Sequence, residues 1–193
     1  GTLWGMGDNR YGQLGDGTTE DKNTSILISD ENIIDFAPGW ESSYYVKSDG
    51  SLHAIGRNNY GQIGDGTTED RNTSIEIVDG NVTAVDAGRG FVLFTKSDGS
   101  LWGVGKNFHG QLGIGNLTDQ SNPVQIINQD VIDFTCGMNA AMFRKNDGSV
   151  WAMGRNSKNC FGEIDDDDDK ITTPVKIWPK NQRWVREKLN LGF

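Results

Sequence analysis

The most conspicuous group of chemically active side chains is the run of five carboxylates from Asp165 to Asp169. Oxygen-rich loops can hold a calcium ion, and alternate members of the run are weak candidates for its ligands: Asp165, Asp167 and Asp169. Consecutive aspartates cannot all turn inward, however, and no glycine bends this loop. The run therefore predicts a solvated acidic loop, with a weak cation site as one alternative. Because Asp-Asp-Asp-Asp-Lys is also a known protease cleavage sequence, an engineered origin is another.

Acidic side chains also gather in two earlier segments, residues 16–23 and 65–72, which are nearly identical. With their threonines they could form an acidic, hydroxyl-rich rim for a basic partner. Glycine, threonine and aspartate also simply make turns, and the composition favours that interpretation. The carboxylates in question are Asp16, Glu20, Asp21, Asp65, Glu69 and Asp70.

The other residues that could do chemistry do not form a recognisable catalytic set. The only histidines, His53 and His109, stand at different places in the repeat described below, so they predict neither a metal pair nor a shared base. Cys136 and Cys160 form no Cys-x-x-Cys pair, which argues against structural zinc and leaves the redox compartment open. The nucleophile motif Gly-x-Ser-x-Gly and the Walker A motif are absent. We therefore expect a protein that is not an enzyme and binds no cofactor.

The charge balance excludes several kinds of partner. The 193 residues include 18 Lys and Arg against 27 Asp and Glu, a formal net charge of -9. Nucleic-acid-binding domains usually show a basic patch or a pI above about 9, so neither a nucleic acid nor an anionic membrane surface is expected as partner. No apolar run approaches the roughly 18 residues of a transmembrane helix. Because the chain begins at Gly1 rather than methionine, the missing signal peptide carries no information.

An internal repeat organises the sequence. The segment from Leu3 to Asn9 recurs at 52, 101 and 150, a constant spacing of 49 residues. Glycine, at 26 of 193 residues, is about twice its usual share of roughly 7%, and it returns at fixed places in each unit. We divide the chain into repeats over 1–178, with units 3–51, 52–100, 101–149 and 150–178, and a non-repeat tail, 179–193.

Each unit contains four short apolar segments that are typical of β-strands. In the first unit they lie at 3–7, 26–28, 33–37 and 44–47. Asp-Gly pairs such as Asp49-Gly50 separate consecutive units and predict type I′ turns, in which both central residues have positive φ. Tryptophans that share the second position of the unit are expected in the core: Trp4, Trp102 and Trp151. Four strands in a period of 40 to 50 residues, with no helical segment, predict an all-β propeller.

The segment Trp4-Gly5-Met6-Gly7-Asp8-Asn9-Arg10-Tyr11-Gly12-Gln13-Leu14-Gly15-Asp16-Gly17 recurs at 53–66 and 102–115. It resembles the RCC1 (regulator of chromosome condensation) repeat, the unit of a seven-bladed propeller. The resemblance covers residues 1–178, although the fourth copy is degraded at 159–163. It implies an RCC1-like β-propeller arc of about three and a half four-stranded blades, a partial seven-bladed propeller.

The resemblance does not fix a function, because functions are set by sites rather than by folds. Proteins with this repeat include GTPase exchange factors, chromatin binders, a plant ultraviolet receptor, enzyme inhibitors and bacterial surface proteins. The photoreceptor's Gly-Trp-Arg-His-Thr segments are reduced here to Gly39-Trp40, and the equivalents of Trp40 are Arg89 and Met138, so its tryptophan cluster is absent. The near-identical units resemble the bacterial surface-type members most, which implies an extracellular or cell-surface location.

We therefore expect a protein-binding or structural scaffold module, part of a larger propeller or a surface assembly. The alternatives are an exchange-factor-like regulator of a small GTPase and a non-catalytic domain fused to an enzyme. Repeat arrays offer an extended surface on which each unit varies a few residues. The candidate partner contacts are Trp40, Arg89 and Met138, each of which follows a glycine before the fourth strand, and Trp184 in the tail.

The strand order argues against simple closure of the ring by two chains. The chain starts on a first-type strand and ends on a second-type strand, so a following chain would supply a first-type strand where a third-type strand is due. Three alternatives stay open: a fragment of a longer propeller, an open arc whose edges pair with other chains, and an arc capped by its own tail. Edge-to-edge self-association is expected of the second, since a bare edge strand pairs readily with other chains.

Overall fold

The computed structural model describes residues 1–30, 32–162 and 169–178. Within these ranges the chain forms fourteen β-strands, one short 3₁₀ helix at Ser157–Asn159 and no α-helix. No helix in the described part of the chain has the length and apolar character to cross a bilayer. The strands are β1 (Leu3–Gly7), β2 (Lys22–Ser29), β3 (Ile33–Pro38), β4 (Ser42–Lys47), β5 (Leu52–Gly56), β6 (Arg71–Val78), β7 (Val82–Ala87), β8 (Phe91–Lys96), β9 (Leu101–Gly105), β10 (Gln120–Ile127), β11 (Val131–Cys136), β12 (Ala140–Lys145), β13 (Val150–Arg155) and β14 (Lys170–Trp178).

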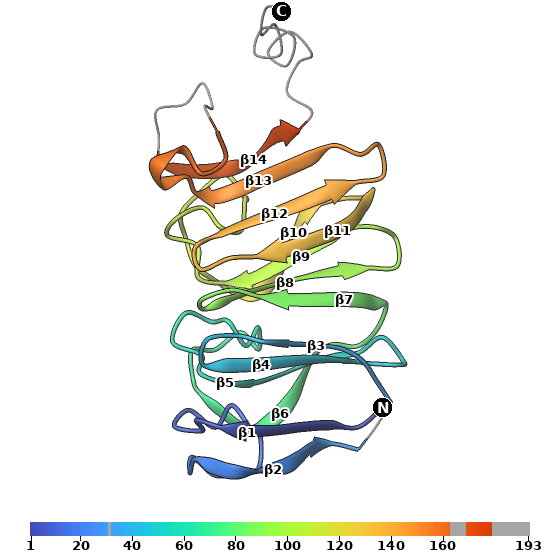
Figure 1. Ribbon diagram of the computed structural model, residues 1–193, viewed down its shortest axis with the longest axis vertical. Helices are drawn as coiled ribbons and strands as arrows, with labels where there is room; N and C mark the ends of the chain where they lie inside the picture. The colour runs from blue at the N-terminus through green and yellow to red at the C-terminus, as the bar shows by residue number, and fades with distance from the viewer. Residues whose placement is uncertain (31, 163–168, 179–193) are drawn as a thin grey trace, which may run out of the picture.

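The strands form three four-stranded antiparallel sheets and one two-stranded sheet. Their orders are β1-β2, β3-β4-β5-β6, β7-β8-β9-β10 and β11-β12-β13-β14, and the sheets follow one another along the long axis of the molecule (Figure 1). This confirms the predicted all-β propeller arc of three and a half blades. Each full blade joins the last two strands of one sequence unit to the first two strands of the next. The half blade, β1-β2, therefore lies at the N-terminal end.

The second strand of each unit is longer than the sequence pattern predicts. We expected it at 26–28 in the first unit, but β2 begins at Lys22, which pairs with Gly7 across a β-bulge. The added residues of this outer strand are mostly exposed and polar, so they carry no apolar signal. The same extension recurs in β6, β10 and β14.

The Asp-Gly turns have a different geometry from the one we expected. Only the glycine has a positive φ, +83° at Gly50, while Asp49 does not. The Gly50 amide bonds to the Lys47 carbonyl, and the Asp49 carboxylate accepts hydrogen bonds from the amide and hydroxyl of Ser51, at 2.9 and 2.7 Å. A single left-handed glycine after a tight turn is the bulged three-residue form of hairpin loop, so the predicted type I′ turn is wrong.

A buried asparagine holds the long loop that joins the first and second strands of each unit. The side-chain oxygen of Asn58 accepts the Ile63 amide at 2.9 Å, and its side-chain nitrogen donates to Asp65 Oδ1 and the Thr67 carbonyl. The backbone amide of Asn58 bonds to Asp70 Oδ1 at 2.7 Å. The corresponding asparagines, also buried, accept the equivalent loop amide: Asn9, Asn107 and Asn156.

Neighbouring blades are joined by apolar packing and by carboxylates. Two clusters of buried side chains fill the spaces between consecutive full blades. At the inner edge, Asp35 Oδ2 of β3 accepts the Val85 amide of β7 at 2.8 Å, and Asp86 Oδ2 accepts the Cys136 amide of β11 at 2.7 Å. Each of these bonds fixes one inner strand against the next.

The tryptophans of the repeat do not share one environment. Trp102 and Trp151 are half-buried and stack on Phe94 and Phe143, but Trp4 is 56% exposed. The expectation that all three lie in the core is therefore wrong for Trp4, because in the described part of the chain β1 pairs only with the outer strand β2 and has no strand on its inner side to cover the ring. His53, at the same position in β5, is buried and stacks on Tyr45.

Replacing Asn58 with alanine should lower the free energy of unfolding by about 2–3 kcal/mol, because the buried Ile63 amide and the loop carboxylate lose their partner. Urea denaturation followed by circular dichroism measures the change. The control is Asn23→Ala, which removes an exposed side-chain amide on β2 and should change stability by no more than about 0.5 kcal/mol. Equal effects of the two substitutions would contradict this role.

Candidate functional site

One rim of the arc collects the longest loops and the predicted contact residues. The turns at 39–41, 88–90 and 137–139 and the loops at 8–21, 57–70 and 106–119 make up what we call the loop rim. Turn and loop meet because the fourth strand of one unit pairs with the first strand of the next, as in Ser42 opposite Gly56. A backbone bond closes each junction, from Arg57 to Glu41, from Lys106 to Gly90 and from Arg155 to Asn139.

The structure brings together two of the predicted partner contacts. Trp40 and Arg89 lie at equivalent turns of consecutive blades, and the Arg89 guanidinium lies over the Trp40 ring at 4.4 Å from its centroid. Met138 occupies the next equivalent turn and is 55% exposed, and Trp40 is 57% exposed. The three side chains therefore form an open series across the full blades. Trp184, the fourth predicted contact, lies outside the described residues.

Cations also bridge neighbouring loops of the rim. The Arg57 guanidinium lies 4.5 Å from the centroid of Tyr11 in the preceding loop, and its Nη1 is 2.5 Å from Glu41 Oε2. The hydrogen bond to Glu41 raises the pKa of Arg57, so this side chain is a fixed cation. Its three groups come from two blades, which ties the rim together across the blade boundary.

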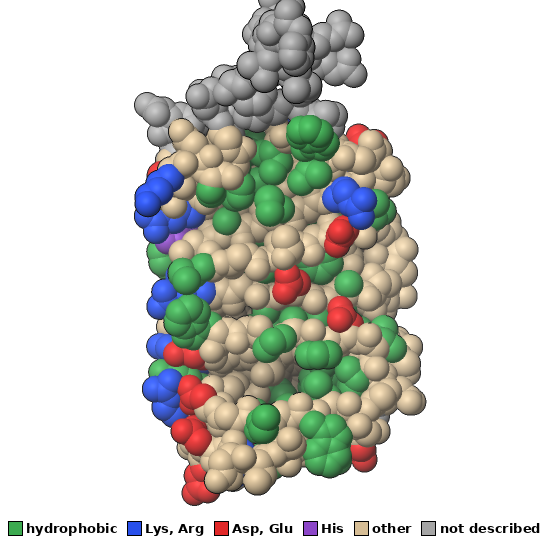
Figure 2. Space-filling model, viewed as in Figure 1, with side chains coloured by type: hydrophobic (Ala, Val, Ile, Leu, Met, Phe, Trp, Pro, Cys, Tyr) green, Lys and Arg blue, Asp and Glu red, His purple; other side chains and the backbone are tan. Residues whose placement is uncertain are grey.

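The equivalent bridge between the next two blades, made by Lys106, is more buried and has more apolar surroundings. Lys106 Nζ lies 4.2 Å from the Phe108 ring centroid and 5.4 Å from that of Tyr60, and it is 3.3 Å from Asn139 Oδ1. Burial, together with the charge of Arg89, lowers the pKa of Lys106. Burial, followed by the charge of Lys106, also lowers the pKa of His109, so this ring is neutral at pH 7. Lys and Arg side chains gather along this side of the molecule (Figure 2).

The acidic loops use most of their carboxylates internally. Asp16 pairs with Lys22 at 3.0 Å, and Asp65 pairs with Arg71. Asp21 and Asp70 accept the backbone amides of the buried asparagines. In the third unit both members of the pair are replaced, by Ile114 and Gln120. The structure therefore favours the turn-forming interpretation of these loops. Their exposed carboxylates include Glu20 and Glu69, and the latter lies 3.8 Å from Arg71.

Two of the weak metal candidates, Asp165 and Asp167, lie outside the described residues. The third, Asp169, is an ion-pair partner of Arg155, with Oδ2 at 3.3 Å from Nε, and its carbonyl accepts the Asn156 amide. Among residues 1–30, 32–162 and 169–178, no group of three His, Cys, Asp or Glu side chains is placed to hold a metal ion. The described part of Asp165–Asp169 thus has a structural role in the fourth loop.

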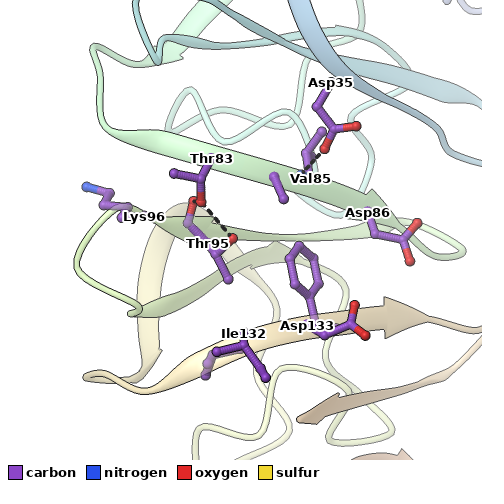
Figure 3. A pocket seen from close by; sticks show the side chains of 11 residues that line it. Asp35, Thr83, Val85, Asp86, Thr95, Lys96, Ile132 and Asp133 are labelled. Carbon is purple, nitrogen blue, oxygen red and sulfur yellow. Dashed lines mark hydrogen bonds between the residues drawn. The ribbon is translucent and has the colours of Figure 1, made fainter. Parts of the chain in front are cut away.

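A cleft of about 510 Å³ opens beside the inner strands, between β7 and β11. Figure 3 shows the polar groups that line it, and they bond mainly to one another or to backbone. Asp35 and Asp86 accept inter-blade amides, and the hydroxyls of Thr83 and Thr95 are 3.1 Å apart. These side chains serve the packing of blades, and their arrangement does not match a nucleophile paired with a base.

Comparison with known protein families shows to which family the chain belongs. The family described as Regulator of chromosome condensation (RCC1) repeat matches residues 1–46, 49–95 and 98–143, and a second model with this description matches 82–111. The chain belongs to the RCC1 repeat family. No curated protein matched the sequence of this RCC1-repeat chain.

Solved structures show the same fold at low sequence identity. Human WBSCR16 superposes with a TM-score of 0.78 at 22% identity over 90% of this chain. Yeast RCC1 (Prp20), in its complex with Kap60, gives 0.77 at 17% over 93%, and Prp20p from Saccharomyces cerevisiae gives 0.73 at 19% over 93%. The RCC1-repeat chain spans about half the length of these proteins, 48%, 46% and 47% respectively. At this identity the likeness shows the fold.

Sequence reasoning missed two kinds of residue in this RCC1-repeat chain. The asparagine of each loop was visible as part of the motif, at a spacing of 49, but nothing in the sequence assigned its bonds. Asp35 and Asp86 each accept a backbone amide of the next blade, but they are 51 residues apart. They therefore fall at different positions of the 49-residue repeat. The Trp40–Arg89 contact could have been found from their equivalent positions on neighbouring turns.

The acidic loops give the RCC1-repeat chain a defined pH dependence. Burial would raise the pKa of Asp65, but hydrogen bonds from Thr67 and Arg71 outweigh burial and lower it. Because the folded-state pKa lies below the unfolded value of about 3.9, Asp65 stabilises the fold above that pH, and the contribution is lost as the pH falls toward the folded-state pKa. We expect Asp65→Asn to cost about 1–2 kcal/mol at pH 6 and progressively less below pH 4.

Urea unfolding of both proteins between pH 6 and pH 2.5 measures this difference. Glu20→Gln, which neutralises an exposed carboxylate in the equivalent loop of the first unit, is the control and should show a small difference at every pH. A cost of Asp65→Asn that stays constant down to pH 2.5 would contradict the assignment.

Proposed function

We propose that this chain is a protein-binding scaffold module whose partner contacts the loop rim at Trp40, Arg89 and Met138. The observation that carries the proposal is the exposed series of these side chains on equivalent turns of three consecutive blades, with Arg89 stacked over Trp40. The rest of each turn and loop is held by backbone bonds that repeat from blade to blade. The backbone bonds that hold the loop rim are thus the same from blade to blade, whereas the side chains that face outward differ.

The chemistry of the series suits recognition of a protein. Tryptophan and arginine are enriched among the residues that dominate binding energies at protein interfaces. Stacking on Trp40 already restricts Arg89, so less conformational entropy is lost when a partner binds. Phe108, 40% exposed, adds a further aromatic surface on the adjacent loop. We expect the partner to bring an apolar group onto Trp40 and Met138 and an acceptor for the free donors of Arg89.

The solved relatives support a protein partner without naming one. Yeast RCC1 (Prp20) is seen bound to Kap60, and Prp20p was studied for binding to Gsp1p and histones. This chain spans about half of those proteins, so their partners are not carried over. The proposal includes placement in a larger propeller or in an extracellular or cell-surface assembly of bacterial type, which rests on the near-identity of the units. Trp184 remains a proposed contact.

A second candidate function is regulation of a small GTPase, because the repeat also builds exchange factors. The third candidate function is that of a non-catalytic domain fused to an enzyme. Nucleotide release from a labelled GTPase distinguishes the second candidate, since an exchange factor accelerates release and a scaffold leaves it unchanged. The loop rim favours the scaffold, because its series is apolar and cationic, whereas nothing in it is specific to a nucleotide-binding partner.

The test compares capture by the unmodified chain with capture by the triple variant Trp40→Ala, Arg89→Ala, Met138→Ala. Cross-linking on cells of the source organism, followed by quantitative mass spectrometry, identifies partners, and calorimetry with the purified partner measures affinity. Removal of these three side chains should weaken the free energy of binding by about 2 kcal/mol or more, which is roughly a 30-fold loss of affinity.

The control is a triple variant on the opposite rim: Asp79→Ala, Ser97→Ala and Gln129→Ala, all exposed positions. It should bind the partner as tightly as the unmodified chain. Equal binding by the loop-rim variant and the unmodified chain would exclude Trp40, Arg89 and Met138 as the contact surface.

A further inference from the structure

Several cations at the loop rim are neutralised within the chain. Three arginines each have a carboxylate partner, in the pairs Arg10–Asp8, Arg57–Glu41 and Arg155–Asp169, which are 2.7, 2.5 and 3.3 Å apart. Among residues 1–30, 32–162 and 169–178, no ion pair includes Arg89 or Lys106. These two cations belong to one junction, because the Lys106 amide bonds to the carbonyl of Gly90, which follows Arg89.

The carboxylate that this junction lacks has a defined place in the preceding blade. Glu41 and Gly90 are equivalent, since their carbonyls accept the amides of Arg57 and Lys106. The side chain of Glu41 neutralises Arg57, but Gly90 has no side chain to offer. Its φ is +81°, and a Cβ at Gly90 would lie 2.9 Å from Cδ2 of Tyr60. The turn before β8 therefore has no room for the carboxylate that the turn before β4 supplies.

Lys106 is a buried cation with a neutral partner. It is 5% exposed, and in the described part of the chain its Nζ donates only to Asn139 Oδ1, at 3.3 Å. Burial and then the charge of Arg89 lower the pKa of Lys106, and the charge of Asp119 opposes them without cancelling them. Because a charge acts over a longer range where little water surrounds it, Lys106 adds to the positive potential at Arg89.

Arg89 is the exposed member of the two. Its guanidinium lies over the Trp40 ring, 4.4 Å from the centroid, which uses the flat face of the group. The donors at the edge of a stacked guanidinium can still bind a carboxylate. Apolar side chains flank this position, with Trp40 57%, Met138 55% and Phe108 40% exposed. The junction thus offers an anion-binding edge within an apolar and aromatic surface.

The other charges of the rim limit the kind of anion that fits. The loops at 8–21 and 57–70 carry exposed carboxylates that include Glu20 and Glu69, and Figure 2 shows Asp and Glu side chains among the cations along this side of the molecule. The whole chain has a formal net charge of -9. An extended polyanion lying along the rim would meet these like charges, whereas a single carboxylate at Arg89 would not.

We propose that the loop rim binds a segment of a partner protein in which an aspartate or glutamate stands beside an aromatic or aliphatic residue. The carboxylate pairs with the guanidinium edge of Arg89, and Lys106 adds electrostatic attraction from within the rim. The neighbouring apolar side chain packs on Trp40, Met138 or Phe108. This inference names the chemistry of the partner at the site proposed above, and it rests on that proposed function.

The first experiment selects ligands without assuming a sequence. A random peptide library displayed on phage is panned on the immobilised 193-residue chain and, in parallel, on the variant Arg89→Glu. We expect the unmodified chain to enrich peptides with a carboxylate next to an aromatic or aliphatic residue, and the variant not to enrich them. A selection that enriches no peptide, or peptides without such a carboxylate, would overturn the proposal.

The second experiment measures the affinity of a synthetic, fluorescently labelled copy of the most enriched peptide by anisotropy. Arg89→Glu should weaken binding at least about tenfold, because the carboxylate then meets a like charge. The matched control is Arg10→Glu, which makes the same charge change at an exposed arginine of the same rim and should alter affinity by less than about twofold. Equal effects of the two substitutions would count against a specific pair with Arg89.

A third variant tests the contribution of Lys106 without changing the shape of the rim. Asn139→Asp gives the buried ammonium group a carboxylate partner at the position of the Asn139 amide. We expect the peptide to bind about threefold more weakly or less tightly still, with no fall in the thermal midpoint measured by circular dichroism. Asn23→Asp, the same charge change on β2, is the control and should leave affinity unchanged. Unchanged affinity of Asn139→Asp would overturn the contribution of Lys106.

The outcomes separate this inference from the proposed function. A natural partner that is lost by the triple variant of Trp40, Arg89 and Met138 but binds Arg89→Glu as tightly as the unmodified chain would leave the proposed function standing and overturn the acidic segment. A partner that binds the triple variant normally would overturn the proposed function itself. Tighter binding of a labelled single-stranded oligonucleotide than of the peptide, abolished by Arg89→Glu, would show a site for polyanions and would also overturn the proposal.

Discussion

The arc depends on the buried asparagine at the start of each long loop. Asn58 uses its side-chain oxygen, its side-chain nitrogen and its backbone amide at once, each bonded to a different part of the loop. A long loop on an outer strand would otherwise be free to move, and the turn of the preceding unit bonds to its first residue. By fixing the loop from inside, the asparagine lets neighbouring loops bond and stack across blade boundaries, as Arg57 does with Tyr11. The geometry of the rim follows from this one residue type.

The unit of sequence and the unit of structure are offset, and the offset decides what the ends of the arc look like. Each blade needs two strands from one repeat and two from the next, so a chain that starts on a first-type strand begins with half a blade. The inter-blade bonds of Asp35 and Asp86 show how an inner strand is held by its neighbour, since Asp35 holds β7 and Asp86 holds β11. In this half blade Trp4 and Met6 are more than half exposed, whereas Val104 and Met153, which are equivalent to Met6, are buried.

The fold could be predicted from the sequence because its strongest sequence patterns repeat. A constant 49-residue spacing fixes the number of strands and sets equivalent residues side by side, which is why the propeller and its three and a half blades could be predicted. Signals that do not depend on repetition were less reliable. The start of β2 is polar and exposed, so apolar patterning placed it four residues late. The turn at Asp49-Gly50 needs positive φ only at glycine because the aspartate side chain bonds onward to Ser51. The exposure of Trp4 depends on a neighbouring strand, which no property of its own segment reveals.

The copies within one chain separate structural from functional positions without reference to other proteins. Residues that bond inside the loop are nearly the same in the first two units, where the cation is Lys22 in one and Arg71 in the other. In the third unit the carboxylate and the cation change together, to Ile114 and Gln120. A paired carboxylate and cation can be exchanged for an apolar and a neutral residue only if both change, because either charge alone would be left without its partner. The turn positions of the loop rim behave differently: Trp40, Arg89 and Met138 share no chemistry beyond the ability to form contacts, yet their backbones are held in the same way. Variation confined to outward-facing side chains on a constant frame is what an extended binding surface requires, since each blade can then meet a different part of a partner.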